Sequence, residues 1–229
     1  MRDYKSVIVI GTTLFIFNGC SGVGPNTQAG TAIGAASGAM IGGLVGGSGR
    51  DMAIGAALGA VAGGAIGYNM DKQANDIAHS LGTGVNNDPL AYLDPNNDLI
   101  VSNNGKYVKI MFRDSMMFAT DSDRLTSSAS YKVSKVGQIL KQYPQTVVEI
   151  AGHTDKRGSY SYNMNLSKNR ARGVADRLYS TGIQNRSYIT GCSYGNPLVD
   201  NSNSQNMALN RRVEIYLYPN NDVRVDACR

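Results

Sequence analysis

The sequence predicts an α+β protein in which a mixed β-sheet, with helices packed on one face, follows two apolar helical arms. Three observations lead to this prediction. Apolar residues alternate in segments of the second half of the chain, two segments with helical periodicity lie between them, and glycine recurs at every fourth position in the first third. A strand, helix, strand, helix, strand order is typical of a sheet covered by helices on one side.

The composition is that of a chain that can bury one good core. Of the 229 residues, 42% are hydrophobic and 17% are charged, which argues against disorder. The formal net charge is +5, but the lysines and arginines are scattered and form no basic stripe, so no nucleic-acid partner is expected. His153 and His79 are the only histidines, and they suggest no metal site or other cofactor.

The N-terminus has the layout of a signal peptide. Arg2 and Lys5 precede an apolar run over residues 7–17 that is too short to span a bilayer. The run closes on Cys20, and a cysteine after a small residue at this position resembles the lipobox of bacterial lipoproteins. The resemblance implies that residues 1–19 are removed.

If Cys20 is the lipidated first residue, its acyl chains anchor residues 20–29 stably to a membrane, because each buried methylene contributes about 0.8 kcal/mol. Ser21, where aspartate would signal retention in the inner membrane, implies the outer membrane and a periplasm-facing protein. The alternative is an ordinary thiol, since Phe17 and Asn18 depart from the usual motif.

Residues 30–69 form two apolar arms with glycine at every fourth position, joined at Arg50 and Asp51. Glycine inside a helix costs about 1 kcal/mol relative to alanine, and close packing of helices in lipid can compensate for this cost. The pattern resembles the glycine-zipper segments of bacterial envelope proteins. We expect a packed helical hairpin, with a flexible glycine-rich linker as the alternative. Insertion in the bilayer and self-association as a homo-oligomer both remain open.

Residues 70–104 are punctuated by Asn, Asp, Pro and Gly and are predicted to be a linker. Beyond it, apolar alternation predicts strands at 107–113 and 212–218, and more continuous apolar runs predict strands at 146–151 and 188–191. Two helical stripes lie between these strands. They consist of Ala129, Val133, Val136 and Leu140, ended by Pro144, and of Ala171, Val174, Ala175 and Leu178, capped by Gly182.

Several polar motifs interrupt these elements. They are GHTD at 152–155, YN at 162–163, LSKNRA at 166–171, GCSYGNP at 191–197 and NRRVEI at 210–215. Together they closely resemble the OmpA-like C-terminal domain shared with the peptidoglycan-associated lipoprotein. The resemblance covers residues 105–219 and leaves a tail over 220–229. It implies non-covalent binding of peptidoglycan through the diaminopimelate of the stem peptide.

The resemblance also implies a set of ligand-binding residues. Asp155 and Arg170 match the two residues that hold the ligand, and Asn163 matches a supporting contact; Asp121, Arg211 and Phe118 match residues that line the site. Diaminopimelate carries an ammonium and a carboxylate close together, which one side chain of each sign can hold. We expect Asp155 and Arg170 to be exposed, and a mutual surface salt bridge is the simpler alternative.

Three further expectations concern individual residues. In an oxidising compartment Cys192 and Cys228 are candidates for a disulfide, with two free thiols as the alternative. His153, at the end of a strand, is expected to make a structural hydrogen bond and not to act as a general base. Arg212 alternates with the apolar residues of its strand and is expected to be solvated or bridging.

These observations predict an outer-membrane lipoprotein that tethers the membrane to the cell wall. No catalytic residues are expected, because no second carboxylate or activated nucleophile accompanies Asp155. The alternative is an oligomeric envelope or secretion assembly, in which the glycine arms associate in or on the membrane and the C-terminal domain only locates the assembly on the wall.

Overall fold

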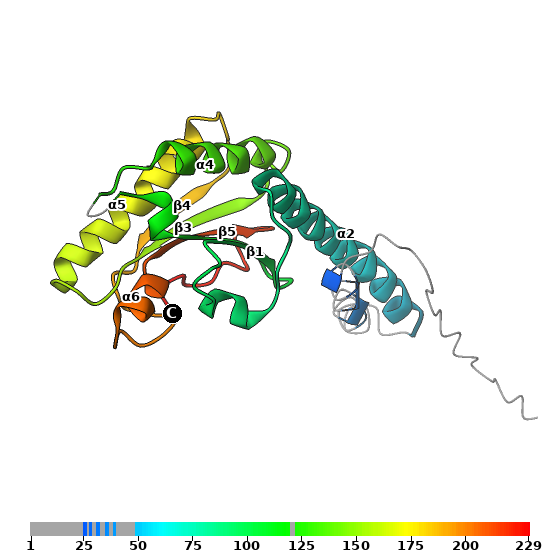
Figure 1. Cartoon of the computed structure of the whole chain (residues 1–229). Helices are drawn as coiled ribbons and strands as arrows, with labels where there is room; N and C mark the ends of the chain where they lie inside the picture. The colour runs from blue at the N-terminus through cyan, green and yellow to red at the C-terminus, as the bar shows by residue number, and fades with distance from the viewer. Residues whose placement is uncertain are drawn as a thin grey trace, which may run out of the picture.

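The computed structural model describes residues 49–119 and 122–229, together with residues 25, 26, 28, 31, 32, 35, 36 and 39. The predicted signal peptide, Cys20, most of the first glycine arm and Asp121 lie outside this part of the chain. Where it is described, the chain forms a mixed sheet that carries long helices on one face, and one helix projects away from the sheet (Figure 1).

The sheet has the strand order β1-β2-β5-β3-β4. Only β3 and β4 pair in parallel, and the other neighbours are antiparallel, so the predicted mixed sheet is confirmed. Because β2 and β3 both run antiparallel to β5, their carboxyl ends lie at the same edge as the start of β5. The strands are β1 (Leu99–Asn103), β2 (Val108–Arg113), β3 (Val147–His153), β4 (Ser187–Gly191) and β5 (Arg212–Tyr218).

The helices on the sheet follow the predicted stripes. Thr126 caps helix α4 (Ser127–Leu140) by accepting a hydrogen bond from the backbone N–H of Ala129. Ser159 caps helix α5 (Tyr160–Tyr179) in the same way. Gly152 of β3 lies against the Ser167 carbonyl of the second helix, where a Cβ atom would not fit. The long helices are α2 (Gly49–Leu81), α4 (Ser127–Leu140) and α5 (Tyr160–Tyr179), and the short ones are η1 (Pro89–Leu93), α3 (Asp114–Met117) and α6 (Ser204–Asn210).

The main core lies between this sheet face and helices α2, α4 and α5. Alternate residues of β2 and β5 point into it, as the sequence predicts, and they meet the apolar stripes of α4 and α5. Helices therefore pack on one face of the sheet, which confirms the predicted architecture. The core residues of β2 and β5 are Val108, Ile110, Phe112, Val213, Ile215 and Leu217, and β1 and β3 add Val101, Val148 and Ile150.

Helix α2 corrects the predicted linker over 70–104. The second glycine arm is helical, but the helix does not end at residue 69; it continues to Leu81 and is followed by Gly82 with φ of +77°. Its last turns are part of the main core, through Met70, Ala74, Ile77, Ala78 and Leu81. Polar residues separate these apolar ones, so the composition of the last turns resembles that of the loop that follows. The sequence therefore did not show where the helix ends.

Strand β1 is the second correction to that linker. It is an edge strand whose residues 99–103 pair with β2. Its apolar run, Leu99 to Val101, is short and lies between turn-forming segments, so the sequence did not predict it. Residues 70–104 thus contain the last turns of α2, the short helix η1 and strand β1, and much of this segment belongs to the folded domain.

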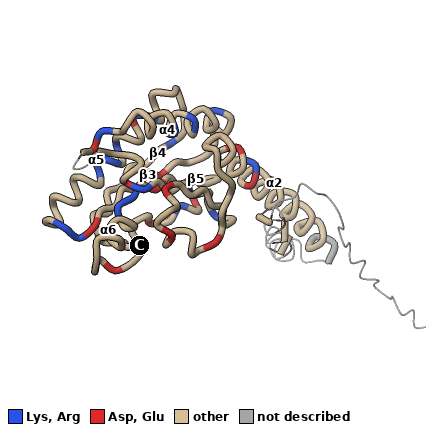
Figure 2. Tube along the Cα trace, viewed as in Figure 1, with Lys and Arg blue, Asp and Glu red and all other residues tan. Residues whose placement is uncertain are grey.

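The first half of α2 projects from the domain and exposes apolar side chains. Met52, Ile54, Leu58 and Val61 are all exposed, the last with 73% of its surface accessible. Met52–Leu81 is long and apolar enough to cross a membrane, and Figure 2 shows charged residues on the domain and on the adjoining turns of α2. Gly64 lies against Thr31 of the first arm, which fits close packing of the two arms.

The other face of the sheet is also buried, which the alternating pattern of β5 did not predict. Arg212, expected to be solvated or bridging, is not solvated but bridges: its side chain is buried, and its Nε lies 3.0 Å from Oε1 of Glu214 while its Nη atoms donate to backbone carbonyl oxygens. Glu214 also accepts a hydrogen bond from the hydroxyl of Tyr216, and Lys109 lies 3.5 Å away. His153 is buried here with Nε2 3.3 Å from Oε2 of Glu214, but neither ring nitrogen has a hydrogen-bond partner among the described residues, so the expected structural hydrogen bond is not formed.

Acidification is expected to destabilise the domain in two stages because of this cluster. Burial, with the nearby charge of Arg212, lowers the pKa of His153 below 6.5. The unfolded chain therefore takes up a proton below about pH 6.5 that the folded chain does not, and stability falls. Burial raises the pKa of Glu214, but Arg212 and His153 outweigh it and hold it well below 4.5, so further loss follows below that pH. Urea unfolding between about pH 8 and pH 2.5 would measure both stages, and constant stability would contradict them.

The C-terminal tail covers part of this second face. Cys228 forms a disulfide with Cys192, so the structure joins the two candidate cysteines. Ala227 is buried in a small cluster with Tyr216 and Tyr218. The end of the tail, at Ala227 and Cys228, is therefore packed against the sheet, whereas residues 220–226 are exposed.

Replacing Cys192 and Cys228 with alanine is expected to lower the free energy of unfolding by about 3 to 4 kcal/mol. The bond joins residues 36 apart and so restricts a long loop in the unfolded chain. Urea unfolding of the oxidised wild type and of the double variant measures the difference. Reduced wild type should behave like the variant, and equal unfolding midpoints in the oxidised proteins would contradict a stabilising bond.

Candidate ligand-binding site

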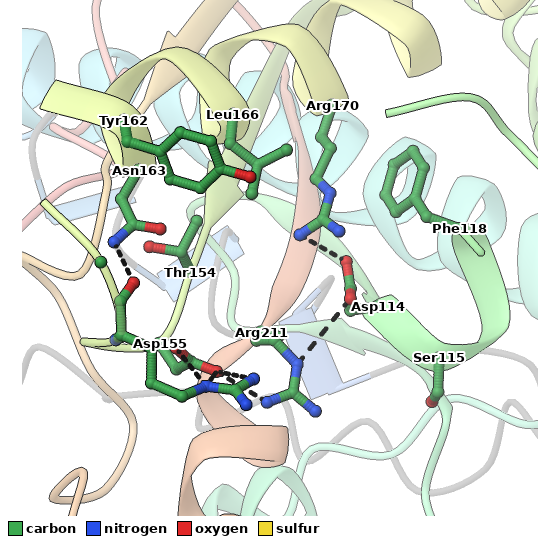
Figure 3. Close-up of a pocket in the computed structure, with 12 residues that line it drawn as sticks. Asp114, Ser115, Phe118, Thr154, Asp155, Tyr162, Asn163, Leu166, Arg170 and Arg211 are labelled. Carbon is green, nitrogen blue, oxygen red and sulfur yellow. Dashed lines mark hydrogen bonds and ion pairs between the residues drawn. The ribbon is translucent and has the colours of Figure 1, made fainter. Parts of the chain in front are cut away.

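A cavity of about 500 Å³ opens at the sheet edge where β2 and β3 end and β5 begins. The topology brings three charged residues together there. Asp114 follows β2, Asp155 lies two residues beyond β3, and Arg211 directly precedes β5. Figure 3 shows these side chains converging on the cavity. Their meeting is a result of strand direction, because the segments are distant in sequence.

Helix α5 supplies the wall of the cavity. Asn163, Leu166 and Arg170 are spaced at i, i+3 and i+7, which places them on one side of the helix. Phe118, after α3, lies opposite, with its ring centroid 5.0 Å from the Arg170 guanidinium carbon. The arginine is thus held against an aromatic face.

Asp155 lies at the base of the cavity, with only 4% of its surface exposed. Its Oδ2 is 2.7 Å from Nη1 of Arg211 and 2.8 Å from Nη2 of Arg157. Burial alone would raise the pKa of Asp155, but hydrogen bonds from Arg157 and Arg211 outweigh it and lower the pKa below 3.8. The carboxylate is therefore charged at neutral pH.

Arg170 and Asp114 form the second charged pair. Nη1 of Arg170 lies 2.8 Å from Oδ1 of Asp114, and its Nε donates to the carbonyl oxygen of Ser122 at 3.1 Å. Arg211 links the two carboxylates, since its Nε is 3.8 Å from Oδ2 of Asp114. Among the described residues, two acidic and three basic side chains thus line a partly enclosed space.

The structure brings together five of the six predicted ligand-binding residues: Phe118, Asp155, Asn163, Arg170 and Arg211 all line the cavity. The sixth, Asp121, lies outside the described residues. One expectation was wrong, because Asp155 and Arg170 are buried, each 4% exposed. The alternative of a mutual salt bridge is not found either, since Arg170 pairs with Asp114 and Asp155 pairs with Arg211 and Arg157.

The sequence reasoning missed two charged residues of the cavity. Asp114 stands immediately after the strand predicted at 107–113, so its place in the sequence was a usable signal. Arg157 lies only two residues from Asp155, but its side-chain direction depends on the turn at Gly158, which has φ of +86°. The other lining residues that were not predicted are Ser115, Thr154, Gly158, Tyr162 and Leu166.

This arrangement can hold a ligand that carries groups of both charges. Guanidinium groups bind carboxylates through paired hydrogen bonds, and carboxylates accept hydrogen bonds from an ammonium. Across the part of the chain that the structure describes, no cluster of three or more His, Cys, Asp or Glu side chains could hold a metal ion.

Comparison with known families defines the class of protein. Residues 117–212 match the OmpA family, and residues 1–71 match the YMGG-like Gly-zipper. The chain therefore carries an OmpA-like domain behind a glycine-zipper segment, in agreement with the predicted organisation. The cavity lies almost entirely within the OmpA match; Asp114 and Ser115 stand just ahead of it.

Individual relatives include a probable lipoprotein, YiaD of Escherichia coli, 32% identical over 155 residues, which are 67% of this chain and 64% of the relative. The peptidoglycan-associated lipoprotein of Legionella pneumophila is 40% identical over 100 residues, or 43% of this chain and 56% of the relative. The chain thus matches less than two thirds of either relative.

Among solved structures, a putative MotB-like protein from Desulfovibrio vulgaris matches 65% of this chain and 95% of its own, with 19% identity and a TM-score of 0.51. At this identity the likeness concerns the fold alone. It agrees with the mixed sheet and one-sided helices described above.

Proposed function

We propose that this protein is an outer-membrane lipoprotein whose OmpA-like domain binds peptidoglycan non-covalently and so tethers the membrane to the wall. The observation that carries the proposal is the cavity in which Asp155 and Asp114 meet Arg170 and Arg211. Relatives named peptidoglycan-associated lipoproteins support it. The protein acts as a mechanical link and not as a catalyst.

The ligand in this proposal is the diaminopimelate of the stem peptide. Its free end carries an ammonium and a carboxylate on one carbon, which suits a site with side chains of both signs. Asp155 receives the ammonium, and Arg170 receives the carboxylate while Asp114 and the Ser122 carbonyl fix its guanidinium. Asn163 donates to the carbonyl oxygen of Arg157 at 2.7 Å and supports the loop beside the ligand.

The test is sedimentation of the full lipidated chain, in detergent, with isolated sacculi. Walls whose stem peptides contain diaminopimelate are compared with walls that contain lysine at the same position, because lysine keeps the ammonium but lacks the neighbouring carboxylate. The protein is expected to pellet with the first walls and remain in solution with the second. Equal pelleting would contradict recognition of diaminopimelate, and no pelleting with either would contradict wall binding.

We further propose that the first half of α2 enters the membrane together with the first glycine arm. No Asp, Glu, Lys, Arg or His stands between Asp51 and Asp71, a stretch about 28 Å long as a helix, close to the thickness of the hydrocarbon core. The exposed apolar side chains of this half support insertion. Because the same helix continues into the domain core, the wall site would be held close to the membrane.

This second proposal is tested with a Cys20→Ala variant, which removes the proposed site of lipidation. Insertion predicts that the variant, expressed with a cleavable signal, stays in the membrane after washing with carbonate. Release of the variant into the wash would show that the lipid alone anchors the protein. Wild type is the control for complete retention.

A further inference from the structure

The carboxylate of Asp155 already has its hydrogen-bonding sites filled by the protein. Its Oδ1 accepts from the backbone N–H of Arg157 at 2.9 Å, and Nε of Arg157 lies 3.2 Å and 3.1 Å from the two oxygens. Oδ2 also accepts from Nη2 of Arg157 at 2.8 Å and from Nη1 of Arg211 at 2.7 Å. A carboxylate offers about four acceptor positions, so a ligand ammonium must replace one of these donors.

Arg157 is the donor that can leave most easily. Its side chain is 68% exposed, whereas that of Arg211 is 27% exposed and also faces Asp114. The released guanidinium of Arg157 would be hydrated by solvent, while release of Arg211 would disturb both carboxylates. The cost of breaking the Arg157 pair is therefore the smaller one.

The backbone of Arg157 need not move when the side chain leaves. Its N–H is hydrogen-bonded to Asp155, and its carbonyl oxygen accepts from Nδ2 of Asn163 at 2.7 Å. Gly158 then turns the chain with φ of +86°, a conformation that glycine adopts without strain. Rotation of the side chain alone can therefore vacate the position beside Asp155.

We propose that Arg157 is an internal stand-in for the ligand ammonium: it neutralises Asp155 in the free protein and is exchanged for the ammonium on binding. This inference rests on the proposed function of the cavity and adds a residue that sets its affinity. The ligand class it selects is one whose cation can displace a guanidinium from Asp155. Because only the fraction of molecules with Arg157 displaced can bind, the pair lowers the apparent affinity for such a ligand.

The test uses the full chain in detergent and a synthetic stem tripeptide that ends in diaminopimelate, titrated by calorimetry. A second tripeptide has the free amine of diaminopimelate acetylated, so that it cannot displace Arg157 as a cation. Arg157→Gln is expected to bind the free-amine tripeptide about fivefold more tightly than wild type, as the loss of a competing pair of about 1 kcal/mol implies. It is expected to show no gain for the acetylated tripeptide.

Lys156→Gln is the matched control, since Lys156 is the exposed neighbour of Arg157 and loses the same charge. It should behave like wild type with both tripeptides, and thermal melting checks that both variants are folded. Weaker or unchanged binding of the free-amine tripeptide by Arg157→Gln would overturn the exchange, as would an equal gain for both tripeptides. If neither wild type nor variant bound either tripeptide, the proposed function itself would fail, and the exchange with it.

Discussion

Asp155→Asn is expected to weaken binding of peptidoglycan by about 100-fold, equivalent to about 3 kcal/mol, because it removes one charge of a buried hydrogen-bonded pair. The proposed ligand ammonium would face a neutral amide in place of a carboxylate that is 4% exposed in the free protein. Arg157 and Arg211 would lose their charged partner, but both side chains reach solvent, so we expect the domain to stay folded. Sedimentation with sacculi measures the loss.

Asp176→Asn is the matched control for this prediction. Asp176 lies on the exposed side of α5 and does not line the cavity, so the same change in charge should leave binding unaltered. Thermal melting of both variants separates loss of the site from loss of the fold. Binding by Asp155→Asn at the wild-type level would remove Asp155 from the site.

Glu214→Ala is expected to lower the free energy of unfolding by about 3 to 5 kcal/mol, the largest effect on stability that we predict. Glu214 is 1% exposed and is the carboxylate around which Arg212, Lys109 and His153 gather. Without it, the buried guanidinium of Arg212 is left beside other basic groups with no compensating charge. Urea unfolding at pH 7.5 measures the effect.

Glu149→Gln provides the comparison, because Glu149 is equally buried on the same face of the sheet. Its cationic partner, Arg224, is 36% exposed and can be hydrated, and the amide oxygen can still accept from Thr190. We expect a loss of about 1 kcal/mol or less. Similar losses in the two variants would show that the charge cluster around Glu214 is no more important than an ordinary buried hydrogen bond.

Much of the fold could be predicted, because the spacing of apolar residues indicates which side chains share one face of a helix or strand. The stripes of α4 and α5 and the alternation in β2 and β5 each carry enough repeats to be recognised. Strand β1 could not be predicted in this way, since its apolar run is short and lies between turn-forming residues. The last turns of α2 were missed because they interleave apolar and polar residues after a strongly apolar segment.

The sequence predicted most residues of the candidate site but not the ion pairs between them. The GHTD and LSKNRA motifs pointed to Asp155 and Arg170, and the structure places both in one cavity. Arg211 was expected to line the site and Asp114 was not, but neither ion pair was predicted, because Asp114 comes from the end of another strand and Arg211 from the start of a third. Such contacts depend on the order of strands in the sheet, which local sequence patterns do not report.

The sequence by itself determined the two-part organisation, the central helices and strands, and the charged residues that could bind a zwitterionic ligand. These features depend on residues close in sequence, whose spacing decides which side chains share a face. Only the tertiary structure decided that Arg212 and Glu214 are buried, that α2 extends into the core, and that Arg157 covers Asp155. Burial on the second sheet face depends on segments that arrive from far along the chain, such as the tail held by Cys228.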